Sequence, residues 1–415
     1  MEDMEVQENS PFYLHRLDSG IRAIITQSQA PVSYLGFMIN AGSRDEKPSN
    51  YGLAHFIEHT IFKGTTTRNS RQIIDRIENI GGEINAYTTK EETTLYCCVP
   101  NKYVERAIEL MTDMLFHPTF PEDKIDSERQ VIIEEIESYK DSPAEQIYDD
   151  FEELVYGRHP LGHNILGTAT HVKRFAASDA KRFMAEHYHS DGIVFFCHTT
   201  HPAERVCDWV QKHLYTVPYT SPRTPREKPD AYMVKRKPFV LKHHQAHCVA
   251  GNVVMDMFGN WKKIPVNMLN HIIAGPCMNS RLNLLLREKY GLVYNIESSV
   301  QHFCDTGLWS LYFGCDRNDI ERCQELIEKD LKELCSTLLS NMQLRKYKMQ
   351  IRGQLAIAAQ SPENVILTYA KNYLHRNSLQ TWEQLALKYE KINADTLQVV
   401  AQEYFAPDKL SWIAI

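Results

Sequence analysis

The sequence predicts an α+β protein built from two homologous domains. In the first half, strand-like segments at residues 12–40 and 84–99 are followed by amphipathic helical patterns at 101–116 and 121–140. The chain has 415 residues, which is too many for one ordinary hydrophobic core. The second half also repeats part of the pattern of the first, which indicates that one domain was duplicated.

The strand segments have the features of antiparallel hairpins. Residues 12–17 are followed by Asp-Ser-Gly and then by the apolar run 21–25, which predicts two strands joined by a tight turn. Residues 32–39 form a further β-rich run, and residues 84–99 are rich in Thr and Tyr. Hairpins of this kind build antiparallel sheets, so we expect an antiparallel sheet in each domain.

A proline-rich segment divides the chain almost in half. Residues 218–229 hold four prolines and have no apolar periodicity, as is typical of an interdomain linker. The predicted domains are therefore residues 1–217 and 230–415. Residues 104–110 resemble residues 320–326, and each segment follows a β-rich stretch that opens with glycine.

Composition and charge argue against two classes of protein, namely nucleic-acid-binding and transmembrane proteins. The chain is 43% hydrophobic and 24% charged, with a formal net charge of −7, so a basic surface for nucleic acid is not expected. No run of about 18 apolar residues occurs, which argues against a transmembrane helix. The acidic residues 1–5 lack the features of a secretory signal, and we expect a cytoplasmic protein.

The cluster His55-Phe56-Ile57-Glu58-His59 predicts a metal site. On a helix, a spacing of four places the His55 and His59 imidazoles on one face, close enough to share a cation. Glu58 then lies beside the metal, where its carboxylate can accept a proton from bound water. Asn50 is the expected cap of this helix. The second half of the chain has no counterpart of the cluster.

A catalytic zinc needs a third protein ligand and an open position for water. Residues 126–137 offer the best candidates, because Glu128 and Glu135 are seven residues apart and face the same side of a helix. Two aligned carboxylates on a partly apolar helix are costly to bury unless they meet a cation. The spacing alone does not choose between them.

Several longer segments resemble the pitrilysin family of zinc metallopeptidases, the inverzincins, whose signature is H-x-x-E-H. The similarity extends over residues 52–65 around the histidines, 81–88, 128–136, and 280–294, which contain an Arg/Tyr motif. It covers essentially the whole chain and is closest to half-length members, such as processing peptidase subunits and bacterial proteins.

The resemblance implies a role for each candidate residue. His55, His59 and Glu135 would be the ligands of one Zn²⁺ per chain. Glu58 would be the general base, and Glu128 would orient a histidine ligand and support the site. Residues 1–217 would form the catalytic domain and residues 230–415 an inactive homologous domain, each a mostly antiparallel sheet with helices packed on one face.

The resemblance also implies how substrate is held. Asn85, Ala86 and Tyr87 would bind an extended peptide as an added strand, and Arg287 and Tyr294 would bind substrate and stabilise the oxyanion. The expected activity is endoproteolysis of unstructured peptides in a closed chamber. A chain of this length would need a partner to close it, either a second copy in a homodimer or an inactive paralogue. The alternative function is that of a non-catalytic peptide-binding or assembly subunit.

Overall fold

The computed structural model describes residues 11–221, 225–237, 245–254 and 261–415. By their contacts, these residues form two units that interleave along the chain. The first unit contains the residues up to 137 together with 164–226 and 359–379, and the second contains 138–163, 227–358 and 380–415. One of the boundaries, between residues 226 and 227, falls inside the expected linker.

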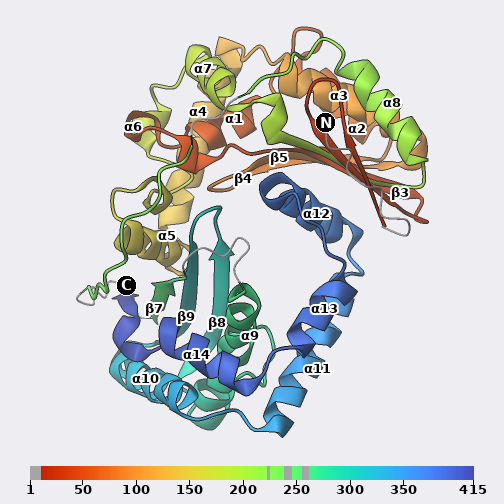
Figure 1. Cartoon of the computed structure of the whole chain (residues 1–415). Coiled ribbons are helices and arrows are strands. Elements are labelled where there is room, and N and C mark those ends of the chain that lie inside the picture. Colours follow the sequence, from red (N-terminus) through yellow and green to blue (C-terminus); the bar gives the residue numbers. More distant parts are fainter. Residues whose placement is uncertain (1–10, 222–224, 238–244, 255–260) are drawn as a thin grey trace. The chain divides into compact units, whose positions relative to one another are not determined.

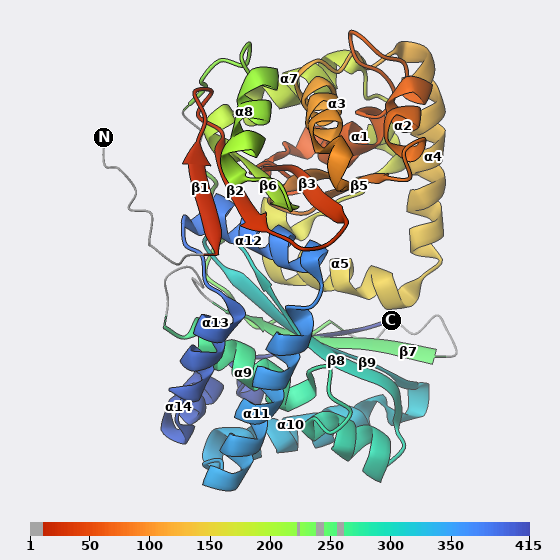
Figure 2. The ribbon, with the colours of Figure 1, turned by 90° about the vertical axis from the view of Figure 1, so that its right-hand side faces the viewer.

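The first unit contains a six-stranded sheet with the order β1-β2-β6-β3-β5-β4. Its strands are β1 (Phe12–Arg16), β2 (Arg22–Gln27), β3 (Val32–Ile39), β4 (Glu83–Thr88), β5 (Thr93–Pro100) and β6 (Ile193–Thr199). All neighbours pair antiparallel except β2 and β6. Figure 2 shows β1, β2, β6, β3 and β5 in succession. The strand β4 forms one edge of this sheet.

Helices cover both faces of the first sheet because its central strands are apolar on both sides. Phe37 and Phe195 face a core shared with the helices α1 and α3, whereas Met38 and Phe196 face α12. Figure 1 shows α12 on one side of the sheet and α2, α3 and α8 on the other. The helices are α1 (Leu53–Thr60), α2 (Ser70–Glu78), α3 (Val104–Phe116), α4 (Glu122–Lys140), α6 (Ala169–Val172), α7 (Ala177–His187), α8 (Ala203–His213) and α12 (Pro362–Arg376).

The second unit contains a four-stranded antiparallel sheet with the order β10-β7-β9-β8. The strands are β7 (Gln245–Val253), β8 (Val293–His302), β9 (Gly307–Asp316) and β10 (Ser411–Ala414). One face packs on α9, α10 and α14, and the other packs on α5. The helices are α5 (Pro143–Tyr156), α9 (Lys263–Ala274), α10 (Ile320–Ser336), α11 (Asn341–Ala358), α13 (Trp382–Glu390) and α14 (Ala394–Tyr404).

The predicted fold class, an α+β protein with two mostly antiparallel sheets and helices packed on one face of each, is confirmed. The structure adds one helix to the opposite face of each sheet. The helix α5 comes from the first half of the chain but packs on the second sheet, and α12 comes from the second half but packs on the first. The repeated sequence segments start α3 and α10, which follow β5 and β9.

Some expectations depend on residues outside the described part of the chain. The acidic N-terminus lies there, and so do residues 222–224 of the expected linker. The cytoplasmic location and the domain boundaries at 217 and 230 therefore stay predictions. Among the described residues, the helices are too short or too polar to cross a bilayer.

Candidate active site

The helix α1 carries the His-Glu-His cluster and is anchored by its apolar face. Phe56 and Ile57 are fully buried in the core of the first unit. This packing orients the opposite side of the helix, where the His55 and His59 rings lie with their centroids 4.6 Å apart. His55 is 6% exposed, whereas His59 is half-buried. The expected helix and the pairing of its two imidazoles are confirmed.

The third candidate ligand comes from α4. Glu135 Oε2 lies 3.7 Å from His55 Nε2 and 3.4 Å from His59 Nε2. Ligand atoms about 2.0–2.1 Å from a tetrahedral zinc lie roughly 3.3 Å from one another. The three side chains therefore have the spacing and the donor types that a zinc ion requires, and their ligand atoms all lie within 4.8 Å of one another.

Glu128 occupies a different place from Glu135, although both belong to α4. Its Oε2 lies 3.3 Å from His59 Nδ1, and its Oε1 lies 2.7 Å from Lys63 Nζ. Glu128 is 8% exposed because it shares the buried stripe of α4 with Ile132 and Ile136. The structure thus separates the two carboxylates that the spacing left equivalent. Glu135 faces the Nε2 atoms of both histidines, whereas Glu128 contacts the other ring nitrogen of His59, Nδ1.

Electrostatics at the cluster favour a bound cation. Burial and the neighbouring His59 lower the pKa of His55 to about 4, so its imidazole is neutral and has a free lone pair at neutral pH. Burial alone would lower the pKa of His59, but Glu135 and Glu128 raise it overall. A zinc ion would replace the proton at Nε2, which faces Glu135, while Nδ1 would keep the proton that it donates to Glu128. His55 Nδ1 has no hydrogen-bond partner among the described residues, so His55 lacks the support that Glu128 provides to His59.

Glu58 is half-buried and lies next to His59 on α1. Burial raises the pKa of its carboxyl group above the ordinary value, and the charge of Glu135 adds to the effect. A carboxylate with a raised pKa binds a proton more readily, which suits a group that must accept one from water. The position agrees with the role expected for Glu58.

The expected substrate strand is β4, which lies beside α1. Among the described residues β4 pairs only with β5, so its second edge is open. Asn85 is exposed, and its Oδ1 accepts a hydrogen bond of 2.9 Å from the Ala86 amide. Tyr87 is half-buried and its ring contacts Tyr96 edge to face, with the centroids 6.1 Å apart. An open edge next to the histidine helix can receive an added strand.

Arg287 and Tyr294 belong to the second unit. Arg287 lies on a π-helical segment, Asn283–Lys289, and its side chain is exposed. Tyr294 is 64% exposed and lies at the start of β8, where a bulge interrupts the pairing with β9. Both side chains are therefore available to a ligand.

One expectation about α1 is wrong. Asn50 does not cap the helix, because its Oδ1 accepts a bond from Ser49 and the N-cap position is Gly52, which has no side chain. The carboxylate of Glu46 instead accepts hydrogen bonds from the first amides of the helix. Sequence reasoning missed Glu46 because no local capping pattern places a carboxylate that far ahead of a helix. It also missed Lys63, which pairs with Glu128.

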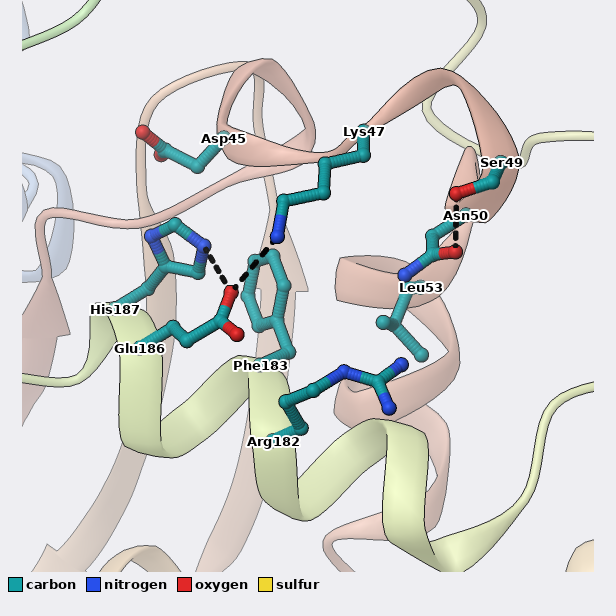
Figure 3. A pocket seen from close by; sticks show the side chains of 9 residues that line it. All are labelled: Asp45, Lys47, Ser49, Asn50, Leu53, Arg182, Phe183, Glu186 and His187. Atoms are coloured by element: carbon teal, nitrogen blue, oxygen red, sulfur yellow. Dashed lines mark hydrogen bonds and ion pairs between the residues drawn. The ribbon is translucent and has the colours of Figure 1, made fainter.

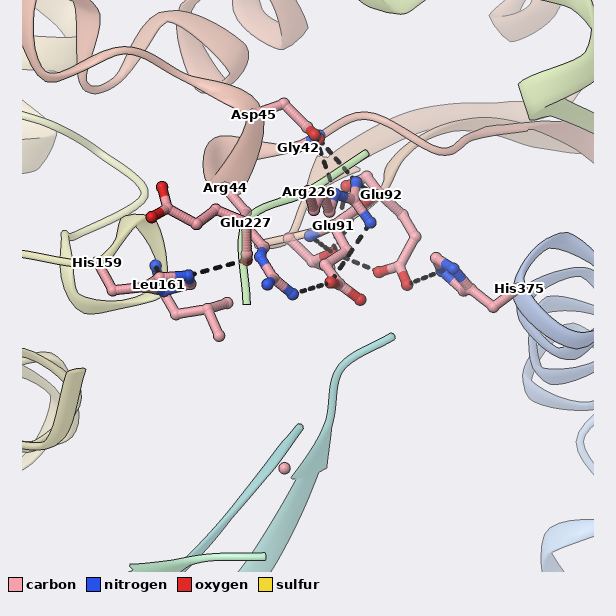
Figure 4. Close-up of polar contacts among 12 residues, drawn as sticks. Gly42, Arg44, Asp45, Glu91, Glu92, His159, Leu161, Arg226, Glu227 and His375 are labelled. Atoms are coloured by element: carbon pink, nitrogen blue, oxygen red, sulfur yellow. Dashed lines mark hydrogen bonds and ion pairs between the residues drawn. The ribbon is translucent and has the colours of Figure 1, made fainter. Parts of the chain in front are cut away.

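The segment around Glu46 is held by buried ion pairs, shown in Figure 4. Arg44 pairs with Glu91 at 2.6 Å, and Asp45 pairs at 2.7 Å with Arg226, which comes from the expected linker. These contacts join the segment to the turn of the β4–β5 hairpin. The start of α1 and the edge strand β4 are therefore connected through one polar network.

A separate pocket of about 250 Å³ lies near the start of α1 (Figure 3). Its charges are largely neutralised, since Lys47 pairs with Glu186 at 3.4 Å and Arg182 pairs with Asp179 at 2.6 Å. None of the candidate zinc ligands lines it. The lining residues are Asp45, Lys47, Ser49, Asn50, Leu53, Arg182, Phe183, Glu186 and His187.

Solved structures resemble the whole chain. The crystal structure of a peptidase M16 inactive domain from Pseudomonas fluorescens matches with a TM-score of 0.88 at 17% identity, covering 98% of each chain. That of a protease from Helicobacter pylori matches with a TM-score of 0.87 at 20% identity, covering 97% of this chain and 98% of the other. At such identities these matches establish the fold alone.

Sequence comparisons identify the family. A zinc protease of Bacillus subtilis named YmxG, described as uncharacterized, is 29% identical over 393 residues, which cover 94% of this chain and 95% of the relative. The beta subunit of the human mitochondrial-processing peptidase is 25% identical over 407 residues, covering 94% and 81%. A family model described as "Insulinase (Peptidase family M16)" matches residues 22–169, and one described as "Peptidase M16 inactive domain" matches residues 174–351. Since the two models together span most of the sequence, the chain belongs to peptidase family M16.

Proposed function

We propose that the protein is a zinc-dependent endopeptidase that hydrolyses unstructured peptides. The observation that carries this proposal is the convergence of His55, His59 and Glu135, with Glu58 next to them on α1. The relatives named as zinc proteases support the same activity. An assembly subunit without activity would have no need of this complete set of donors.

The residues of the chain define the steps. Zinc, when held by the two imidazoles and Glu135, supplies a water of lowered pKa, about 7, and polarises the scissile carbonyl. Glu58 takes a proton from the attacking water and returns it to the nitrogen of the leaving amine. Glu128 holds His59 in the orientation in which Nε2 faces Glu135. The peptide lies along the open edge of β4, where main-chain hydrogen bonds give affinity with little sequence preference.

Cleavage of a quenched, unstructured peptide tests the proposal. We expect turnover that is lost with a chelator and restored by zinc. Glu58→Gln should lower kcat by at least about 100-fold while the variant still binds one zinc per chain, because Glu58 is not among the ligands. Full activity in metal-free protein, or in Glu58→Gln, would refute the assignment. A folded protein substrate serves as the control and should resist cleavage.

We further propose that two copies form a homodimer that closes the peptide chamber. Relatives that are named as subunits, and that align with more than nine-tenths of this chain, support assembly with a second chain. Arg287 and Tyr294 would then bind the substrate of the partner copy and stabilise its oxyanion. A heterodimer with an inactive paralogue is the alternative.

Complementation tests the homodimer. Glu58→Gln chains and Arg287→Ala chains, each inactive alone, are mixed under conditions that exchange subunits. In a mixed dimer one of the two sites has both intact residues, so activity should return to roughly half of the wild-type value per dimer. Confirmed mixed dimers without activity would exclude action across the dimer.

A further inference from the structure

The helix that carries the catalytic cluster is poorly equipped to form alone. It has only eight residues, and so short a helix is unstable in isolation. Its N-cap is Gly52, whose φ of 100° suits glycine but which offers no side chain to the first amides. The amides at this end therefore need acceptors from elsewhere, because buried N–H groups without a partner are costly.

Glu46 provides both acceptors. Its Oε2 accepts a hydrogen bond of 2.8 Å from the Gly52 amide, and its Oε1 accepts one of 2.7 Å from the Ala54 amide. Glu46 is 5% exposed, so these bonds are shielded from water. Burial raises the pKa of Glu46 to about 8, although the hydrogen bonds from the Ala54 and Gly52 amides favour its ionised form. One side chain thus binds the start of α1 at two points, the second directly before His55.

The backbone that carries Glu46 is itself fixed. The amides of Ser43 and Arg44 donate to the carbonyls of Thr89 and Lys90, at 3.1 and 2.7 Å. Asp45 Oδ2 accepts a bond of 2.9 Å from the Gly42 amide. The β4–β5 hairpin turn therefore fixes the backbone of Glu46, and Glu46 in turn fixes the start of α1.

A second close contact limits movement at the start of α1. Gly167 has a φ of +69° and lies so close to Tyr51 that a Cβ atom would come within 2.0 Å of the Tyr51 carbonyl oxygen. A Cβ atom on Gly52 would come within 2.6 Å of the Leu166 carbonyl oxygen. The backbone at residues 166–167 therefore packs directly against residues 51–52, which lead into the helix.

We infer that Glu46 is a positioning residue. It fixes the position of α1, which carries His55, Glu58 and His59, relative to Glu135 of α4. This inference rests on the proposed function and adds a determinant of its geometry. Because the ligands come from two different helices, a shift of α1 changes the distances from Glu135 to both imidazoles at once. A displacement of about 1 Å can cost about 100-fold in rate.

The test replaces Glu46 with glutamine, which has the same shape but can accept from only one of the two amides. We expect Glu46→Gln to lower kcat about 100-fold, leave KM within about twofold, and weaken zinc affinity about tenfold. Amide hydrogen exchange of residues 52–60 should accelerate. Zinc affinity is measured by competition with a chromogenic chelator and does not depend on turnover.

Asp113→Asn is the matched control. Asp113 is a buried carboxylate of the same unit whose Oδ2 accepts from Thr65, Thr67 and Arg68, and none of these donors belongs to α1. We expect this variant to lose thermal stability but to keep kcat, zinc affinity and the exchange rates of residues 52–60. An equal loss of kcat in Asp113→Asn would show that general destabilisation, and not positioning, explains the effect.

Two further outcomes are decisive. Unchanged kcat, zinc affinity and exchange in folded Glu46→Gln would overturn the inference. If that variant does not fold, Glu46→Asp keeps the carboxyl group but is one methylene too short for both bonds, and wild-type zinc affinity in it would equally overturn the inference. If the wild-type protein cleaves no peptide, the proposed function fails, while zinc affinity and exchange still decide the role of Glu46.

Discussion

Replacing Glu128 by glutamine tests how strongly the second carboxylate of α4 supports the metal site. Glutamine keeps an oxygen that can accept from His59 Nδ1, so the variant loses the charge and not the bond. The contact is long, 3.3 Å, which places it at the weak end of charge-assisted bonds. A charge-assisted bond exceeds a neutral one by about 1–1.5 kcal/mol, which corresponds to about a tenfold change in zinc affinity.

Removing the whole side chain should have a larger effect. Glu128→Ala leaves His59 Nδ1 without its acceptor and Lys63 without the partner at 2.7 Å, so we expect about a 100-fold loss of zinc affinity. Chelator competition measures both variants, and activity at saturating zinc shows whether the ligands remain aligned. Glu134→Gln, an exposed position on the same helix, is the control. Wild-type affinity in Glu128→Ala would refute the reasoning.

Two further predictions concern the buried carboxylate Glu92 and the open edge of β4. Although burial alone would raise the pKa of Glu92, the hydrogen bond from His375 and the charge of Lys371 hold it well below its ordinary value of 4.5. A group whose pKa is lower in the folded than in the unfolded state stabilises the fold above about pH 4.5, and this stability is lost as the pH falls further. The free energy of unfolding of Glu92→Gln, measured in urea, should therefore depend less on pH below that value than that of the wild type. The same dependence on pH in both proteins would contradict this prediction. The Ala86 amide donates to Asn85 Oδ1, and counting the alternating antiparallel pairs from the Thr89–Glu92 bond places this amide on the edge of β4 that faces away from β5. Ala86→Pro should raise KM about fivefold with little change in kcat, as measured on several peptides, and an unchanged KM would show that substrate does not use this edge.

The helices α5 and α12, each of which packs on the sheet formed mostly by the other half of the chain, show why the organisation of the domains was only partly predictable. The helical periodicity of residues 143–156 and 362–376 is a local property, but the sheet on which each helix packs is not. The helix α5 meets apolar side chains of β7, and α12 meets those of β6 and β3. The local sequence pattern would allow either helix to pack on any apolar sheet face. The choice of sheet for each helix is therefore made by the tertiary fold.

The sequence by itself determined the local chemistry of this protein. Residues 55–59 form a helix with two imidazoles on one face, and the hairpins and α4 lie where their periodicity predicted, because backbone geometry sets such spacings over a few residues. Only the tertiary structure decided that Glu135, 76 residues after His59, faces both Nε2 atoms while Glu128 faces Nδ1. It also decided that Glu46 caps α1. Contacts between distant segments depend on how whole elements pack, and no short spacing in the chain records that packing.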